Sequence, residues 1–133
     1  MSDLSVKTLK KAQGIVNDDA AFRHLGNVDL TMGIKVGKLT YLISFAGFSC
    51  SAVRKISANE IREADFMIEM SKTQWDAFIA GCRSGDGPSL AQLDSREYVV
   101  KAEDPRKKLQ FLRYHNSIQA FFVALAMPEP TPA

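Results

Sequence analysis

The spacing of apolar residues changes from a helical to a strand period within the first third of the chain. Between residues 4 and 16 apolar side chains recur at helical spacing with lysines between them, which predicts an amphipathic helix. From residue 28 to 36 apolar and polar residues alternate, as they do in a half-buried strand. Gly37-Lys38 then predicts a tight turn into a return strand over residues 39–45. The pattern therefore predicts a helix followed by a β-hairpin.

A strand that leads directly into a helix is the most clearly marked unit of the chain. Residues 65–70 begin polar and then carry apolar side chains at almost every place, which is typical of a strand covered on both faces. Ser71 and Gln74 follow at the spacing of a capping box, in which the serine hydroxyl accepts from the Gln74 backbone N–H and the glutamine side chain reaches back to the cap. We expect a helix over residues 72–80 that Gly81 ends in a left-handed turn.

Shorter elements and one long helix complete the pattern. Residues 48–56 predict a third, weaker strand, 89–93 a helix of one or two turns, and 97–101 a fifth strand. Asp104-Pro105 is a helix start, because a carboxylate caps the first turn and the missing N–H of proline costs nothing at the first helical position. That last helix is expected to extend to about Leu125.

Length and composition fit one domain of ordinary size. The chain has 133 residues, of which 46% are apolar and 24% charged, and its net charge is +2. No repeat or linker divides it, so we expect a single domain over residues 1–126 and a proline-rich tail over 127–133. No apolar run approaches the roughly 20 residues that span a bilayer, and the small net charge favours no nucleic-acid partner. The start Met1–Leu4 lacks the order of a signal peptide, so we expect a cytoplasmic protein in which Cys50 and Cys82 are thiols.

The last helix begins with an unusual run of positive charge. Arg106, Lys107 and Lys108 lie in its first turn, where the helix macrodipole favours negative charge. The run could hold a phosphate or carboxylate beside free backbone N–H groups. The simpler interpretation is a solvated basic turn near Asp104 and Glu103.

The end of the same helix is apolar on every side. Residues 120–127 read Ala-Phe-Phe-Val-Ala-Leu-Ala-Met, whereas a helix that packs by one face needs only an apolar stripe. We therefore expect burial from more than one side, by the core of the chain, by a ligand or by another subunit.

Residues able to do chemistry are few. His24 and His115 have no cysteine or carboxylate at metal-ligand spacing, so no metal site is predicted. A dyad such as Cys82 with His115 stays open, because such partners meet only in space. Binding is therefore favoured over catalysis. The carboxylates that could act as acid or base are Asp65, Glu69, Asp94 and Glu97.

The aromatic residues are the better lead. They lie on elements that should share one interior, and most aromatic stripes are simply packed core. The alternative is that they line a space for an apolar ligand. The set comprises Phe45, Phe48, Trp75, Phe78, Phe111, Phe121 and Phe122.

Several segments resemble the sterol carrier protein type two domain family. Residues 64–71 (Ala-Asp-Phe-Met-Ile-Glu-Met-Ser) are similar to its strand-to-helix segment, and 75–81 (Trp-Asp-Ala-Phe-Ile-Ala-Gly) to its helix ending in glycine. Residues 89–93 and 98–101 lie where the family has a short helix and its last strand, and the hairpin over 32–45 also matches in place. The resemblance covers the layout of most of the chain.

This resemblance implies an α+β fold, in which a five-stranded, mainly antiparallel sheet carries helices on one face and an apolar tunnel lies between sheet and helices. It also implies binding or transfer of a fatty acyl chain, an acyl-CoA ester or a sterol-like molecule, without a cofactor. Lys101, Arg106 and Lys107 are the expected partners of an anionic head group. The expected lining of the tunnel is Trp75, Phe78, Ile79, Leu90, Phe111, Ile118, Phe121 and Phe122.

Two other functions remain open. The chain could be an accessory or interaction subunit, as a homodimer or as the partner of a larger enzyme, in which residues 120–127 pack on another chain and no cavity exists. It could also be a small cavity enzyme, such as a dehydratase, isomerase or cyclase. The first alternative predicts an oligomer without lipid, and the second predicts a titratable group inside the cavity.

Overall fold

The computed structural model describes residues 6–24, 29–47, 49–57, 60, 64–102 and 104–126. Phe48 and the predicted tail over 127–133 lie outside these ranges. The elements in chain order are α1 (Val6–Asn17), α2 (Ala20–His24), β1 (Leu30–Val36), β2 (Leu39–Ala46), β3 (Ser49–Ile56), β4 (Phe66–Met70), α3 (Lys72–Ser84), α4 (Leu90–Glu97), β5 (Val100–Lys101) and α5 (Pro105–Ala126).

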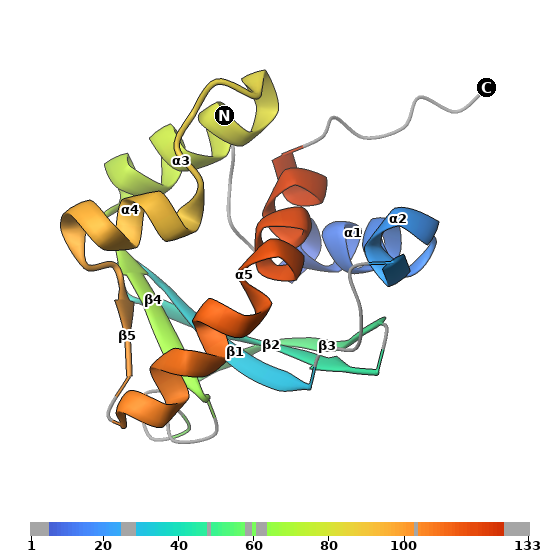
Figure 1. The fold of residues 1–133 in the computed structure, drawn as a ribbon, viewed down its shortest axis with the longest axis horizontal. Coiled ribbons are helices and arrows are strands. Elements are labelled where there is room, and N and C mark those ends of the chain that lie inside the picture. The colour runs from blue at the N-terminus through green and yellow to red at the C-terminus, as the bar shows by residue number, and fades with distance from the viewer. Residues whose placement is uncertain are drawn as a thin grey trace.

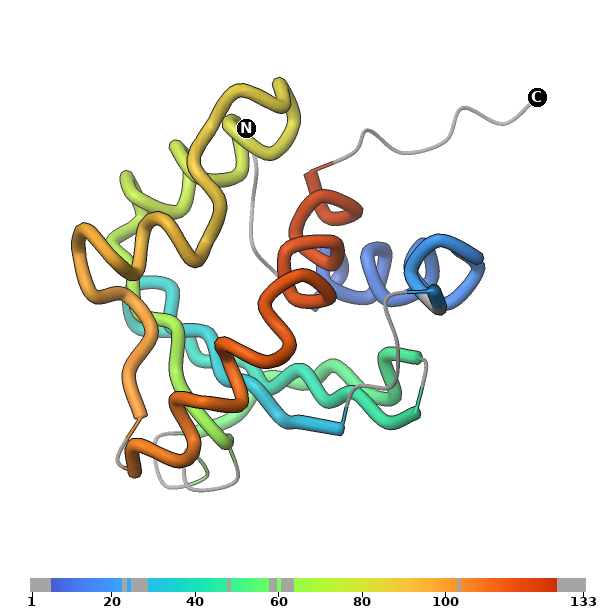
Figure 2. Tube along the Cα trace, viewed as in Figure 1, coloured from blue at the N-terminus to red at the C-terminus, as the bar shows by residue number. Residues whose placement is uncertain are grey.

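The strands form one five-stranded sheet in the order β3-β2-β1-β4-β5. Central strands β1 and β4 run parallel, and every other neighbouring pair is antiparallel. The predicted five-stranded, mainly antiparallel sheet is therefore confirmed, with one parallel pair. The helices gather over one face of the sheet, and α5 crosses that layer between α1 on one side and α3 with α4 on the other (Figure 1, Figure 2).

Alternation along the strands sorts the side chains between two faces. Ile43 of β2 and Phe66 of β4 face the helices and belong to the main core. The residues beside them on the same strands, Leu42 and Met67, face the other way and flank Gly33 of β1. We call the side without helices the outer face. A step of one residue along a strand therefore moves a side chain from the helix layer to the outer face.

The apolar end of α5 is buried within the chain itself. Phe121, Phe122 and Ala126 have no exposed surface, because α1 packs against one side of α5 and α3 against the other (Figure 1). The predicted burial from more than one side thus needs no second subunit for the residues up to 126. None of the helices in the described ranges combines the length and the apolarity needed to cross a bilayer.

The starts of the two main helices follow the predicted signals. The Gln74 N–H donates to Ser71 Oγ at 3.1 Å and the Ser71 N–H donates to Gln74 Oε1 at 2.8 Å, so the capping box of α3 is confirmed. The Arg106 N–H donates to Asp104 Oδ1 at 2.9 Å, so α5 begins at Pro105 as expected. Both signals involve residues within one turn of each other, which is why they are visible in the sequence.

The predicted end of α3 at Gly81 is wrong. The helix continues to Ser84, and Gly85, with φ 80°, is the residue in the left-handed conformation. Gly81 has a packing role instead, since a Cβ at this position would lie 2.8 Å from the Cα of Gly87. A glycine that lets two backbone segments touch gives the same sequence signal as one that ends a helix.

The fifth strand is shorter than predicted, because α4 is longer. A second capping box, between Ser89 and Gln92, starts α4, which runs to Glu97. Tyr98, with φ 52°, is its left-handed C-cap. Only Val100–Lys101 remains as β5. The run of apolar residues that predicts a strand here therefore straddles a helix end.

Candidate functional site

A continuous row of aromatic rings runs through the layer between the sheet and the helices. It begins on α2, continues through β2 and α5, and ends on α3, so it joins segments far apart in the sequence. Neighbouring ring centroids are 5.4–6.3 Å apart, a normal separation for aromatic pairs. Each ring is exposed by 4% or less. We call this set the aromatic row; in order of contact it comprises Phe22, Phe45, Phe121, Phe122 and the pair Trp75 and Phe78.

The residues predicted to line a tunnel all lie in this layer, where they are closely packed. Phe111, Ile118, Phe121 and Phe122 have 0% exposed surface, so no space of water size lies against them. An apolar guest can enter here only if side chains move apart. Phe111 packs edge-on against Phe66, with the centroids 5.6 Å apart. The other predicted lining residues, Trp75, Phe78, Ile79 and Leu90, are exposed by 1% to 2%.

Two phenylalanines of the layer, Phe22 and Phe66, are absent from the set that the sequence suggests. Phe22 lies in the five-residue helix α2, which is too short to show a period. Phe66 opens β4, a strand with buried residues on both faces, so only its pairing with Met32 decides that it faces the helices. Strand register was the missing information for Phe66.

Hydrogen bonds fasten α3 and α4 to α5 beside the aromatic row. Arg83 Nε donates to the Ala126 carbonyl at 2.8 Å. Gln119 of α5 accepts from the Leu90 N–H at 2.9 Å and donates to Cys82 Sγ at 3.6 Å. These contacts hold together the helices that a guest in the layer would have to separate.

Several of the residues proposed for chemistry have structural partners or lie at the surface. Burial raises the pKa of Cys82 to about 11, so its thiol is protonated at neutral pH and is not an activated nucleophile. Its hydrogen-bond partner is Gln119 rather than His115. Asp65 Oδ2 accepts from the Thr31 N–H at 2.8 Å, which joins the approach to β4 to β1. His24 is exposed. Within the described ranges, no three side chains of metal-binding types come together.

The basic turn at the start of α5 is partly used inside the chain. Lys108 Nζ lies 2.6 Å from Asp94 Oδ2 and also donates to the Val100 carbonyl at 2.6 Å, which ties α5 to α4 and β5. Asp94 Oδ1 accepts from the Val100 N–H at 2.8 Å. Arg106 Nε lies 3.8 Å from Asp104 Oδ1, and the Arg106 side chain is 90% exposed, as a solvated basic turn would be.

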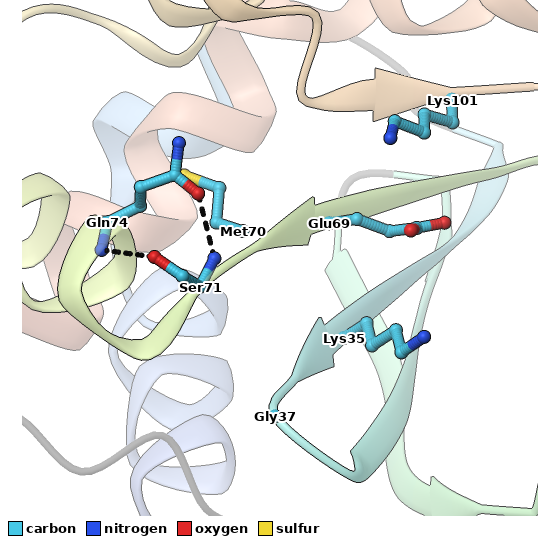
Figure 3. Close-up of a pocket in the computed structure, with 7 residues that line it drawn as sticks. All are labelled: Lys35, Gly37, Glu69, Met70, Ser71, Gln74 and Lys101. Carbon is cyan, nitrogen blue, oxygen red and sulfur yellow. Dashed lines mark hydrogen bonds between the residues drawn. The ribbon is translucent and has the colours of Figure 1, made fainter.

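An open hollow of about 330 Å³ lies where β1 and β4 end and α3 begins (Figure 3). Of the three residues predicted to meet an anionic head group, Lys101 lines this hollow. Arg106 and Lys107 are not part of the lining, because α5 starts near the opposite end of β4 from α3 (Figure 1). The hollow is lined by Lys35, Gly37, Glu69, Met70, Ser71, Gln74 and Lys101.

Comparison with known proteins bears on the fold. No family model matches the chain, and no curated protein matches it. A solved structure does match: the solution structure of a conserved hypothetical protein, a candidate sterol carrier protein, from Thermus thermophilus. The TM-score is 0.69 at 12% identity, over 98% of this chain and 94% of that chain. The two proteins share a fold. The five-stranded sheet with helices on one face is the α+β arrangement that the sequence resemblance implies.

Proposed function

We propose that this chain binds an apolar or amphipathic small molecule, a fatty acyl chain, an acyl-CoA ester or a sterol-like compound, between its sheet and its helices. The observation that carries the proposal is the aromatic row, which extends from Phe22 on α2 to Trp75 on α3. Apart from Ser117, the fully buried side chains that the structure describes in this helix layer are apolar or aromatic. The fold likeness to a candidate sterol carrier protein supports the same class of ligand.

Burial of an alkyl chain can offset the cost of opening this layer. Each buried CH₂ contributes about 0.8 kcal/mol, so about ten methylenes contribute about 8 kcal/mol. An aromatic pair is worth about 0.5–1.5 kcal/mol beyond its area, and a typical hydrogen bond about 0.5–1.5 kcal/mol net. A chain of that length therefore compensates for the separation of several such contacts, and it needs no polar anchor for affinity.

The seam between α5 and the unit formed by α3 and α4 is the proposed route of opening. Trp75 and Phe78 contact Phe122 across this seam. Hydrogen bonds of Arg83 and Gln119 cross this seam. Separating the two sides would place a guest directly against these rings.

Trp75 is the single tryptophan of the chain and lies in the aromatic row, so its fluorescence reports on the proposed site. A fatty acid that carries bromine atoms on its alkyl chain should quench Trp75 in a saturable manner, because bromine quenches only at contact. The matched control is Trp75→Phe combined with Leu112→Trp. Leu112 is 51% exposed on α5, so a tryptophan there should show only weak, unsaturable quenching.

The same titration separates the proposal from its alternatives. Absence of saturable quenching at Trp75, together with a native mass equal to a lipid-free oligomer, would contradict ligand binding and favour the interaction subunit. Co-purification of a lipid in native mass spectrometry, with saturable quenching at Trp75 and only weak, unsaturable quenching at the position 112 reporter, is the expected result.

A further inference from the structure

The hollow at the start of α3 borders the apolar interior through a single flexible side chain. Met70 lines the hollow and also belongs to the main core, where it is exposed by only 6%. Trp75 Nε1 donates to the Lys35 carbonyl at 2.8 Å, so the α3 end of the aromatic row lies against the backbone of a lining residue. Methionine is unbranched and adapts readily to new neighbours. Met70 is therefore the lining residue that separates the hollow from the main core, and its side chain is of a kind that can move when the seam opens.

Charged side chains from neighbouring strands lie side by side in the hollow (Figure 3). Lys35 of β1 and Glu69 of β4 are register partners, and Lys101 of β5 lies diagonally across from Glu69. Within the described residues none of these charges has an ion-pair partner, although the Lys101 ammonium lies 5.8 Å from the centre of the Tyr98 ring. Two ammonium groups and one carboxylate give the hollow a formal charge of +1, which a single carboxylate would neutralise.

The frame of the hollow is held in place by contacts that do not involve these charges. The capping box of Ser71 and Gln74 fixes the first turn of α3. The Glu69 N–H donates to the Val99 carbonyl at 2.8 Å, which fixes the end of β4 against the approach to β5. The charged ends are thus presented from a rigid base, which lowers the ordering cost of binding an ion.

We infer that this hollow holds the carboxylate head group of the ligand, with Lys35 and Lys101 as its partners, while the alkyl tail passes Met70 into the aromatic row. The inference rests on the proposed function and specifies the head group. Charge-assisted hydrogen bonds from the lysines stabilise the carboxylate. Glu69 limits the site to a single negative charge, since a dianion would leave repulsion unbalanced.

The test compares a brominated fatty acid with the brominated alcohol of the same chain length, both measured by quenching of Trp75. Lys35→Ala and Lys101→Ala should each weaken the acid about fivefold or more, because each removes a charge-assisted contact. The alcohol should change by less than about twofold, because its tail site is intact. Glu69→Gln should tighten the acid by about threefold through loss of repulsion. The control is Lys55→Ala, an exposed lysine on the opposite edge strand β3, which should leave both unchanged.

The outcomes distinguish this inference from the function on which it rests. If acid and alcohol both bind and neither lysine variant affects the acid, the head-group site is wrong while tail binding stands. If neither compound quenches Trp75 in the parent protein, the proposed function itself fails. If Glu69→Gln weakens binding, Glu69 serves a positive group, and the assignment to a carboxylate ligand is overturned.

Discussion

The two faces of the sheet are made from alternate residues of the same strands, and they differ in depth and in chemistry. Toward the helices, Ile43 and Phe66 join a large core that contains the aromatic row. On the outer face, Leu42 and Met67 belong to a separate small cluster. Gly33, which lies between these two residues in the register, contributes no side chain. Residues that are equally buried on the two faces therefore belong to clusters of very different size.

The outer face also carries the charges that the helix face lacks. Lys35 and Glu69 point outward from β1 and β4, one residue before Val36 and Met70, which pack toward the interior. An apolar compartment and a charged one are thus separated by one step of strand register, and they approach each other at the strand ends. This arrangement suits a ligand with an apolar tail and a charged head. It also means that each face can be perturbed separately.

The largest expected effect is a difference in unfolding free energy between matched truncations on the two faces of the sheet. Ile43 and Leu42 are neighbours on β2, exposed by 0% and 2%, and truncation to alanine removes the same number of carbons from each. Ile43→Ala should cost about 4 kcal/mol and Leu42→Ala about 2 kcal/mol, the upper and lower parts of the usual range for buried aliphatic residues. Ile43 lies in the large core, whereas the small outer cluster can collapse around a deletion.

Equilibrium unfolding in urea measures both free energies, and the slope of the transition checks that the unfolding behaviour is unchanged. Equal losses for Ile43→Ala and Leu42→Ala would mean that the outer face is as deeply packed as the helix face. The comparison between the faces would then be wrong.

A smaller effect tests the contact between Gly33 of β1 and Met67 of β4 on the outer face. A Cβ on Gly33 would overlap the Met67 sulfur and would also approach Ala64 Cβ at 3.4 Å. Gly33→Ala should therefore cost about 1–2 kcal/mol, the lower part of the usual range for overpacking, since the end of the Met67 side chain can shift aside. Because the overlap is with the end of a flexible side chain, Gly33→Ala in a Met67→Ala background should cost less than about 0.5 kcal/mol. A double-mutant cycle by urea unfolding measures the coupling; additive losses would show that the strain comes from the backbone.

Local signals in the sequence predict much of this fold. The capping box at Ser71 and the Asp104-Pro105 start of α5 involve residues within one turn, and the alternation over 28–36 is a property of one strand. The helix end predicted at Gly81 was wrong, because the role of Gly81 depends on Gly87, which contacts it only after the chain folds. Helix and strand types were thus predictable, whereas boundaries that depend on tertiary contact were not.

The candidate site was predictable only in part for the same reason. Aromatic residues on long periodic elements, such as Phe121 and Phe122, can be placed in the interior from their spacing. Lys35 and Glu69 carry no such signal, since they become neighbours through the parallel pairing of β1 with β4. Met70 reads as an ordinary strand residue, and its place between hollow and core follows from where β4 ends.

The smallest effect is a pH dependence that belongs to the helix side of the sheet. Burial raises the pKa of the Cys50 thiol from the usual 9.0 to about 12. The pKa of Cys50 is higher in the folded state than in the unfolded state. The contribution of the protonated thiol to the free energy of unfolding is therefore complete below pH 9 and is lost as the pH rises from 9 through about 12. Between pH 7 and pH 10 the parent should lose about 1 kcal/mol more than Cys50→Ala. Burial also raises the pKa of Tyr41, but that residue is common to both proteins and cancels in the difference. Urea unfolding at the two pH values measures the two losses; parallel losses would place Cys50 in contact with water and weaken the contrast between a closed helix face and an open outer one.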